Sequence, residues 1–147
     1  MSEILEIRFA LSVRQPWAWL IVNGFKDVEN RLWQTFMRGP RFIHTGKVMK
    51  EEEYNDCYFF LEEHFPHIRL PRAQDLPLGG IVGIASITDC VTRSNSKWFV
   101  GDYGFLMEDQ QPCEFIPCKG EKGFFRPCHE GGSYVTASDL KFLKKAA

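Results

Sequence analysis

The residues of this sequence that could do chemistry are concentrated in a charged segment near its N-terminus, which contains Lys26, Glu29 and Arg31. Residues 27–33 alternate in a pattern typical of a β-strand, so Glu29 and Arg31 are predicted to share one face, roughly 6–7 Å apart. Arginine offers a planar fork for a phosphate or a base edge, and a carboxylate accepts a hydrogen bond from an exocyclic amine. Lys26, at the turn before the strand, could contact a phosphate or, with its pKa lowered by burial, act as a base. These residue types predict a site for a ligand that carries phosphate or nucleobase groups.

The same residues also admit a structural interpretation. Lys26, Glu29 and Arg31 could form an internal ion-pair network that holds the edge of a sheet. Trp17 and Trp33 are equally ambiguous, because aromatic residues on helices and strands belong to the core more often than they stack on a ligand.

Charge is distributed unevenly along the chain of 147 residues, which has 18 Lys+Arg, 19 Asp+Glu and a net charge of −1. Residues 26–50 contain six basic and two acidic residues, an excess of +4, whereas residues 51–63 contain six acidic residues and no basic one, an excess of −6. The near-neutral total excludes a protein that coats polyanions with its whole surface. The basic segment is interleaved with aromatic residues, which favours a confined nucleic-acid site. The alternative is a solvated face that pairs with the acidic segment.

Several motifs occur in a characteristic order. S-x-R-Q-P-W-A at residues 12–18 is followed by G-x-K-x-x-E-x-R at residues 24–31 and by Trp33. Later landmarks are Gly-Gly-Ile-Val-Gly from position 79, Trp98, Tyr-Gly-Phe from position 103 and Lys-Gly-Glu-Lys-Gly-Phe-Phe from position 119. In this order the motifs closely resemble those of the ASCH domain family, over about residues 11–125.

The resemblance implies an α+β fold of the PUA-like type, a mixed β-barrel of about six strands with two or three flanking helices. It also implies a cleft beside the G-x-K-x-x-E-x-R strand. PUA-like relatives bind RNA and some recognise a modified or flipped base, so the expected partner is RNA or DNA, or a single modified base or nucleoside. The residues expected to contact this ligand are Gln15, Trp17, Lys26, Glu29, Arg31, Trp33, Lys47, Lys119 and Lys122.

Catalysis is an alternative use of the same cleft, because ASCH members have also been assigned to ribonuclease activity and to amide hydrolysis of acetylated cytidine. Relatives that resemble amide hydrolases have a K-x-x-T spacing that supplies a hydroxyl nucleophile, whereas this chain has Glu29 at that position. A glutamate lacks that hydroxyl but could activate water as a general base. In an enzyme Lys26 and Glu29 would be the catalytic residues, with His44 as another candidate base for a ribonuclease. A third alternative is a protein–protein adaptor that uses the acidic segment, although no obligate protein partner is evident.

The cysteines do not indicate a cofactor. The chain has five cysteines and no C-x-x-C pair, which favours reduced thiols over a disulfide framework. A zinc site could be imagined from Cys113, Cys118, Cys128 and His129, but their spacing is poor for structural zinc. We therefore expect neither metal nor cofactor.

The helices and strands that must position these residues are predicted from the hydrophobic periodicity of the sequence and from its glycine and proline residues. Strands are predicted at residues 8–13, 27–33, 40–44, 81–91, 103–108 and 113–117. Apolar residues on both faces of the 81–91 segment predict a strand in the middle of a sheet. Helices are predicted over about residues 16–24, over about residues 49–65 with an aromatic stripe in the core, and over residues 138–145.

The chain is expected to form one domain over residues 1–147. No apolar run is long enough to span a membrane, and the first residues lack the order of a secretory signal. These features favour a cytoplasmic protein.

Overall fold

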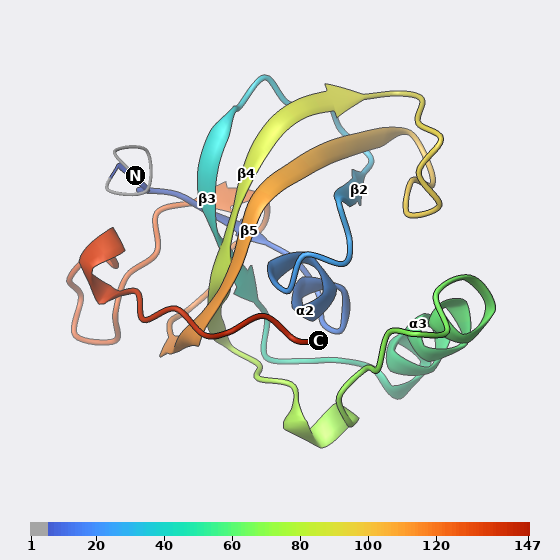
Figure 1. Ribbon diagram of the computed structural model, residues 1–147. Coiled ribbons are helices and arrows are strands. Elements are labelled where there is room, and N and C mark those ends of the chain that lie inside the picture. Colours follow the sequence, from blue (N-terminus) through green and yellow to red (C-terminus); the bar gives the residue numbers. More distant parts are fainter. Residues whose placement is uncertain (1–5) are drawn as a thin grey trace.

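Two long antiparallel strands, β4 (Gly80–Val91) and β5 (Tyr103–Pro117), form the centre of a mixed sheet in this computed structural model, which describes residues 6–147. The sheet has six strands in the order β2-β5-β4-β3-β1-β6 and curls into a half-barrel (Figure 1). The other strands are β1 (Ala10–Ser12), β2 (Val28–Arg31), β3 (Gly39–Thr45) and β6 (Phe124–Phe125). β1 and β3 are parallel, and the remaining neighbours are antiparallel.

The position of β4 follows from its sequence. Its residues are buried on both faces from Gly80 to Ile87. Val82 and Ala85 belong to one core cluster, whereas Ile81 and Ile84 belong to a second cluster that includes Val135. The prediction of a central strand is therefore confirmed. The α+β class and the mixed PUA-like barrel of six strands are confirmed as well.

Helix α2 (Trp17–Val22) lies inside the curve of the sheet, and helix α3 (Glu51–His64) lies outside it (Figure 1). α2 approaches β4 so closely that a Cβ on Gly83 would lie 2.6 Å from Cγ1 of Val22. Only glycine leaves room for the helix there. α3 packs through Cys57 and Leu61 against a second core cluster that includes Leu20, Val28 and Trp98.

The aromatic stripe predicted for the core face of α3 is only partly buried. Of the predicted stripe, Cys57 and Leu61 are buried, Tyr54 and Phe65 are half-buried, and Tyr58 is exposed. α3 lies outside the curve of the sheet (Figure 1), so only a narrow face of this helix is covered by the rest of the protein.

The strands predicted at residues 103–108 and 113–117 are one continuous strand, β5. Polar residues separate the two predicted strands, but Gln110 is buried and its side-chain amide donates to the carbonyls of Ile21 and Lys26, at 2.7 and 2.6 Å. The strand continues because this polar side chain binds these two carbonyl groups. The register of β4 and β5 shifts several times along the pair, which accommodates the extra residues.

The helix predicted over residues 138–145 is wrong. Only the 3-10 turn η2 (Ala137–Asp139) forms, and a second such turn, η1 (Ala73–Asp75), precedes β4. The tail instead runs along β5, where the Leu143 N–H donates to the carbonyl of Pro112 and the Glu114 N–H donates to that of Lys141. These backbone bonds to an existing strand replace the helical ones that the tail would otherwise make.

Two further expectations concern the ends of the chain and the membrane. The prediction that the chain lacks a secretory signal was based on residues 1–6, and residues 1–5 lie outside the described residues. Within the described part of the chain, no helix combines the length and apolar character needed to cross a bilayer.

Candidate functional site

Lys26, Glu29 and Arg31 form a linked ion-pair network. Oε2 of Glu29 lies 3.0 Å from Nη2 of Arg31, and Oε1 lies 3.5 Å from Nζ of Lys26. Lys26 also donates to the carbonyl of Val28, and Arg31 donates to the carbonyl of Ser12. The predicted sharing of one strand face by Glu29 and Arg31 is thus borne out by their contact.

This network is largely shielded from solvent. Lys26 is 3% exposed and Glu29 is 8% exposed, so both charges depend on their partners. Burial lowers the pKa of Lys26, and the neighbouring Glu29 carboxylate partly opposes that shift. Arg31 is the member that reaches the surface, and its buried Nε has no hydrogen-bond partner. Because Arg31 joins β2 to β1, which are not neighbours in the sheet, the network closes the seam of the half-barrel.

Gln15 and Trp17 lie on the inner side of this network. Gln15 is buried, donates to the carbonyl of Pro77 at 3.2 Å and accepts from the Trp19 N–H at 3.0 Å. Trp17 is half-buried, with its ring 6.2 Å from that of Phe60 and 5.9 Å from Nζ of Lys26. Both side chains therefore have internal contacts that hold the start of α2.

The three lysines predicted to contact phosphates gather around one hollow. Lys47 follows β3, whereas Lys119 and Lys122 follow β5, and all three are exposed. The hollow, called the lysine groove below, has a volume of about 550 Å³. Its other lining residues are Ser12, His44, Gly46, Gly79, Cys118, Gly120, Glu121 and Glu130. Three lysines against two glutamates leave the groove with a net positive charge.

His44 forms the floor of the lysine groove and is buried. Its Nε2 lies 2.8 Å from the carbonyl of Cys118, which requires a proton on Nε2 and leaves Nδ1 as an acceptor with no partner. Gly120 packs directly on this ring, because a Cβ there would lie 2.3 Å from Cε1 of His44. The sequence singled out His44 only as a candidate base and missed Ser12 and Gly120. The glycines of the Lys-Gly-Glu-Lys-Gly run were the available signal for Gly120.

Protonation of His44 is expected to destabilise the fold. Burial lowers the pKa of His44 below its usual 6.5, an effect that the Cys118 carbonyl partly opposes. The unfolded chain therefore binds this proton first, and the free energy of unfolding falls as the pH drops below about 6.5, by at most about 1.4 kcal/mol per pH unit. Urea unfolding between about pH 7.5 and 5.5 should show a shallower pH dependence for His44→Gln, which keeps a donor for Cys118. The exposed His67→Gln serves as the control, and parallel curves for His44→Gln and wild type would contradict this role.

The lysine groove adjoins the ion-pair network through Ser12. The Ser12 carbonyl accepts from Arg31, and the Ser12 N–H donates to the carbonyl of Gly123 at 3.2 Å. Gly123 directly follows Lys122 and faces Trp33, since a Cβ on Gly123 would lie 3.9 Å from Cζ2 of that ring. The predicted residues thus divide into an inner set of Gln15, Trp17, Lys26 and Glu29 and an outer set of Arg31, Trp33, Lys47, Lys119 and Lys122.

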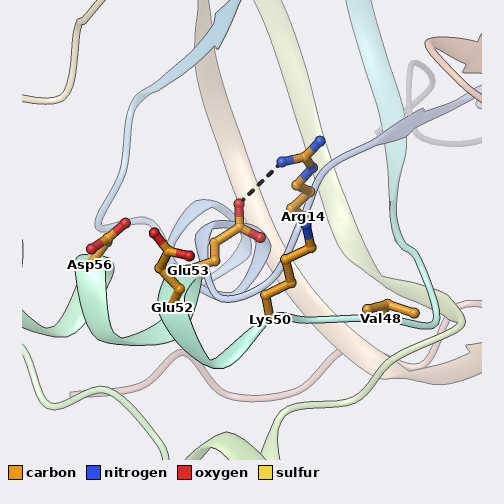
Figure 2. A pocket seen from close by; sticks show the side chains of 6 residues that line it. All are labelled: Arg14, Val48, Lys50, Glu52, Glu53 and Asp56. Carbon is orange, nitrogen blue, oxygen red and sulfur yellow. Dashed lines mark hydrogen bonds and ion pairs between the residues drawn. The ribbon is translucent and has the colours of Figure 1, made fainter.

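A second hollow, of about 400 Å³, lies beside α3 and has a different charge. Figure 2 shows the Glu53 carboxylate directed at Arg14, in an ion pair of 3.4 Å, with Glu52 and Asp56 further along α3. Val48 and Lys50 complete the lining. Among residues 6–147, no basic residue of the 26–50 segment forms an ion pair with α3. The acidic segment therefore leaves the lysine groove unneutralised and would itself repel a polyanion.

The cysteines have no metal-binding arrangement in the described part of the chain, which contains no cluster of three or more His, Cys, Asp or Glu side chains suited to a metal ion. Burial raises the pKa of Cys113 to about 12 and that of Cys118 to about 11, as expected for thiols that fill the core. His129 instead pairs with Asp139 at 2.9 Å.

Comparison with known proteins gives a consistent set of relatives. The model of the ASCH domain family matches residues 11–117. The chain is 34% identical over 118 residues to Activating signal cointegrator 1 from Homo sapiens and 35% identical over 118 residues to the protein of that name from Mus musculus. Each match covers 76% of this chain but only 19% of the relative, so the chain corresponds to about a fifth of those proteins.

Proposed function

The chain belongs to the ASCH domain family, a PUA-like family often linked to RNA binding, and we propose that it is a nucleic-acid-binding module, with RNA as the first candidate ligand. In this proposal the phosphates lie along the lysine groove, contacted by Lys47, Lys119 and Lys122. Arg31, at the adjoining seam, contacts a further phosphate or a base edge. Lys26 and Glu29 act indirectly, because they hold the guanidinium of Arg31 in place.

The observation that carries the proposal is the meeting of lysines from two distant chain segments in one groove. Lys47 and the Lys119–Lys122 pair are separated by more than 70 positions, yet they line the same hollow. Exposed like charges repel, so their convergence in one hollow is characteristic of an anion site. Their spread around the groove suits a backbone with several phosphates better than a single small anion.

Binding fits the geometry better than catalysis. Both oxygens of Glu29 are paired with cations, and Nδ1 of His44 is buried beneath Gly120. Lys26, the third candidate base, is buried and paired with Glu29. None of the three therefore presents a free acceptor to the groove, as a general base must.

The test is a titration of binding against salt. Fluorescence anisotropy with a labelled RNA single strand of about 12 nucleotides should give log K falling with log salt at a slope near −2, because three neutralised phosphates contribute about 0.7 each on a single strand. A flat dependence, or no binding at about 50 mM salt to RNA or DNA, would refute the phosphate contacts. The same samples are then separated by electrophoresis, and cleavage of the RNA would show that the groove is catalytic.

A further inference from the structure

The loop between β2 and β3 exposes large apolar side chains and buries a polar one. Leu32 is 83% exposed, Phe36 is 82% exposed and Trp33 is 39% exposed, whereas the polar Thr35 is buried. Large exposed apolar side chains gathered in one short loop are unusual, and exposed apolar patches usually mark an interaction site.

Polar groups of the loop hold it in this conformation. The Thr35 hydroxyl accepts from the Met37 N–H at 3.1 Å. Nη1 of Arg38 donates to the carbonyls of Thr35 and Met37 at 3.1 and 2.9 Å, and Nη2 of Arg38 lies 3.5 Å from Asp89. The apolar side chains are therefore displayed by a loop in which three backbone groups are already hydrogen-bonded, which reduces the entropy lost on binding.

Cations flank the aromatic part of this loop. The Trp33 ring meets Phe105 and Phe124 edge-on, at 5.1 and 5.7 Å between centroids, which fixes its orientation. The guanidinium of Arg31 lies 5.9 Å from the Trp33 ring, and that of Arg41 lies 5.5 Å from the Phe124 ring. Within residues 6–147, Arg41 forms no ion pair, and its buried Nε has no hydrogen-bond partner. An apolar surface beside the guanidinium of Arg41, which has no acidic partner among the described residues, matches a ligand that combines flat rings with negative charge.

The loop is also continuous with the lysine groove. Gly123 faces Trp33 and directly follows Lys122 of the groove. A strand whose phosphates lie in the groove would cross Gly123, where no side chain obstructs it, and bring its next bases to Trp33 and Phe36.

We propose that residues 32–37 form a stacking platform for unpaired bases, so that the ligand of this module is single-stranded rather than duplex nucleic acid. The inference rests on the proposed function and deepens it. Aromatic rings can stack only on bases whose faces are free, and in a duplex those faces are covered by neighbouring pairs. The lysines supply affinity for the backbone, and the platform supplies the preference for single strands.

The experiment compares three probes of equal length, about 12 nucleotides: a uridine single strand, an abasic phosphodiester strand and a hairpin duplex. The single strand should bind more tightly than both of the others. Phe36→Ala should weaken its binding by about tenfold while leaving the abasic strand unaffected, because one stacked base contributes about 1–3 kcal/mol. Phe59→Ala removes another exposed phenyl group, from α3, and should change nothing. Because Phe36 is exposed, its variant should retain the wild-type urea midpoint.

The possible failures are distinguishable. Equal affinity for duplex and single strand, or a Phe36→Ala affinity equal to wild type, would overturn the platform while the lysine-dependent binding stands. Loop-dependent dimerisation or binding to anionic vesicles, with RNA affinity unchanged in Phe36→Ala, would overturn it in favour of another partner. Failure of all three probes to bind would overturn the proposed function itself.

Discussion

Replacing Lys47, Lys119 and Lys122 together with alanine is expected to weaken binding to single-stranded RNA by about 100-fold near 0.1 M salt, equivalent to about 2.7 kcal/mol. All three ammonium groups line the same groove and are exposed, so their removal takes charge from the ligand path without disturbing the core. The slope of log K against log salt should flatten by about two, since each lysine accounts for about 0.7 on a single strand. Anisotropy titrations at several salt concentrations measure both quantities.

The matched control replaces Lys141, Lys144 and Lys145, three exposed residues of the C-terminal tail that do not line the groove. It changes the net charge by the same amount, so only position distinguishes the two variants. Charges outside the groove should contribute little once the Debye length falls to about 10 Å at 0.1 M salt. Similar losses in both variants would mean that affinity comes from diffuse charge, and the groove would not be the binding site.

The sequence predicted the parts of the fold that depend on local periodicity. The apolar residues on both faces of β4 indicated a central strand, and the alternation of residues 27–33 placed Glu29 beside Arg31. β5 was predicted as two strands separated by its polar middle. The partners that make Gln110 acceptable inside a strand are the carbonyls of Ile21 and Lys26, 89 and 84 positions away in sequence. No local pattern contains that information.

The candidate site likewise contains features that the sequence could predict and features that depend on distant contacts. The three predicted lysines lie around one groove, and their contact with phosphates belongs to the proposed function. For Lys26, Glu29 and Arg31 the residue types fit a pocket or an internal network equally well. The choice depends on the carbonyls of Val28 and Ser12, which are oriented by the closure of the barrel. The display of Phe36 likewise depends on Arg38 holding two loop carbonyls, a contact that the sequence does not reveal.

Glu29→Gln is expected to lower the free energy of unfolding by about 3 kcal/mol, because it leaves two largely buried cations without their shared carboxylate. Nζ of Lys26 and Nη2 of Arg31 lie 3.5 and 3.0 Å from the two oxygens of Glu29, and the amide that replaces one oxygen would direct a donor at a cation. Urea unfolding at pH 7 measures the loss. Glu121→Gln, an exposed carboxylate of the groove, is the control and should stay within about 0.5 kcal/mol of wild type.

The deficit of Glu29→Gln should shrink as the pH rises from 7 toward about 10, a dependence that a simple packing defect would not produce. Burial already lowers the pKa of Lys26 below 10.5. The Glu29 carboxylate raises this pKa, so removing its charge lowers the pKa of Lys26 further. The folded variant then releases the Lys26 proton at a pH where the unfolded chain still holds it, so its stability increases with pH in that window. Lys26→Met in the Glu29→Gln background should remove this pH dependence. If Glu29→Gln instead keeps wild-type stability and loses only RNA binding, Glu29 contacts the ligand directly, and the internal network is not its main role.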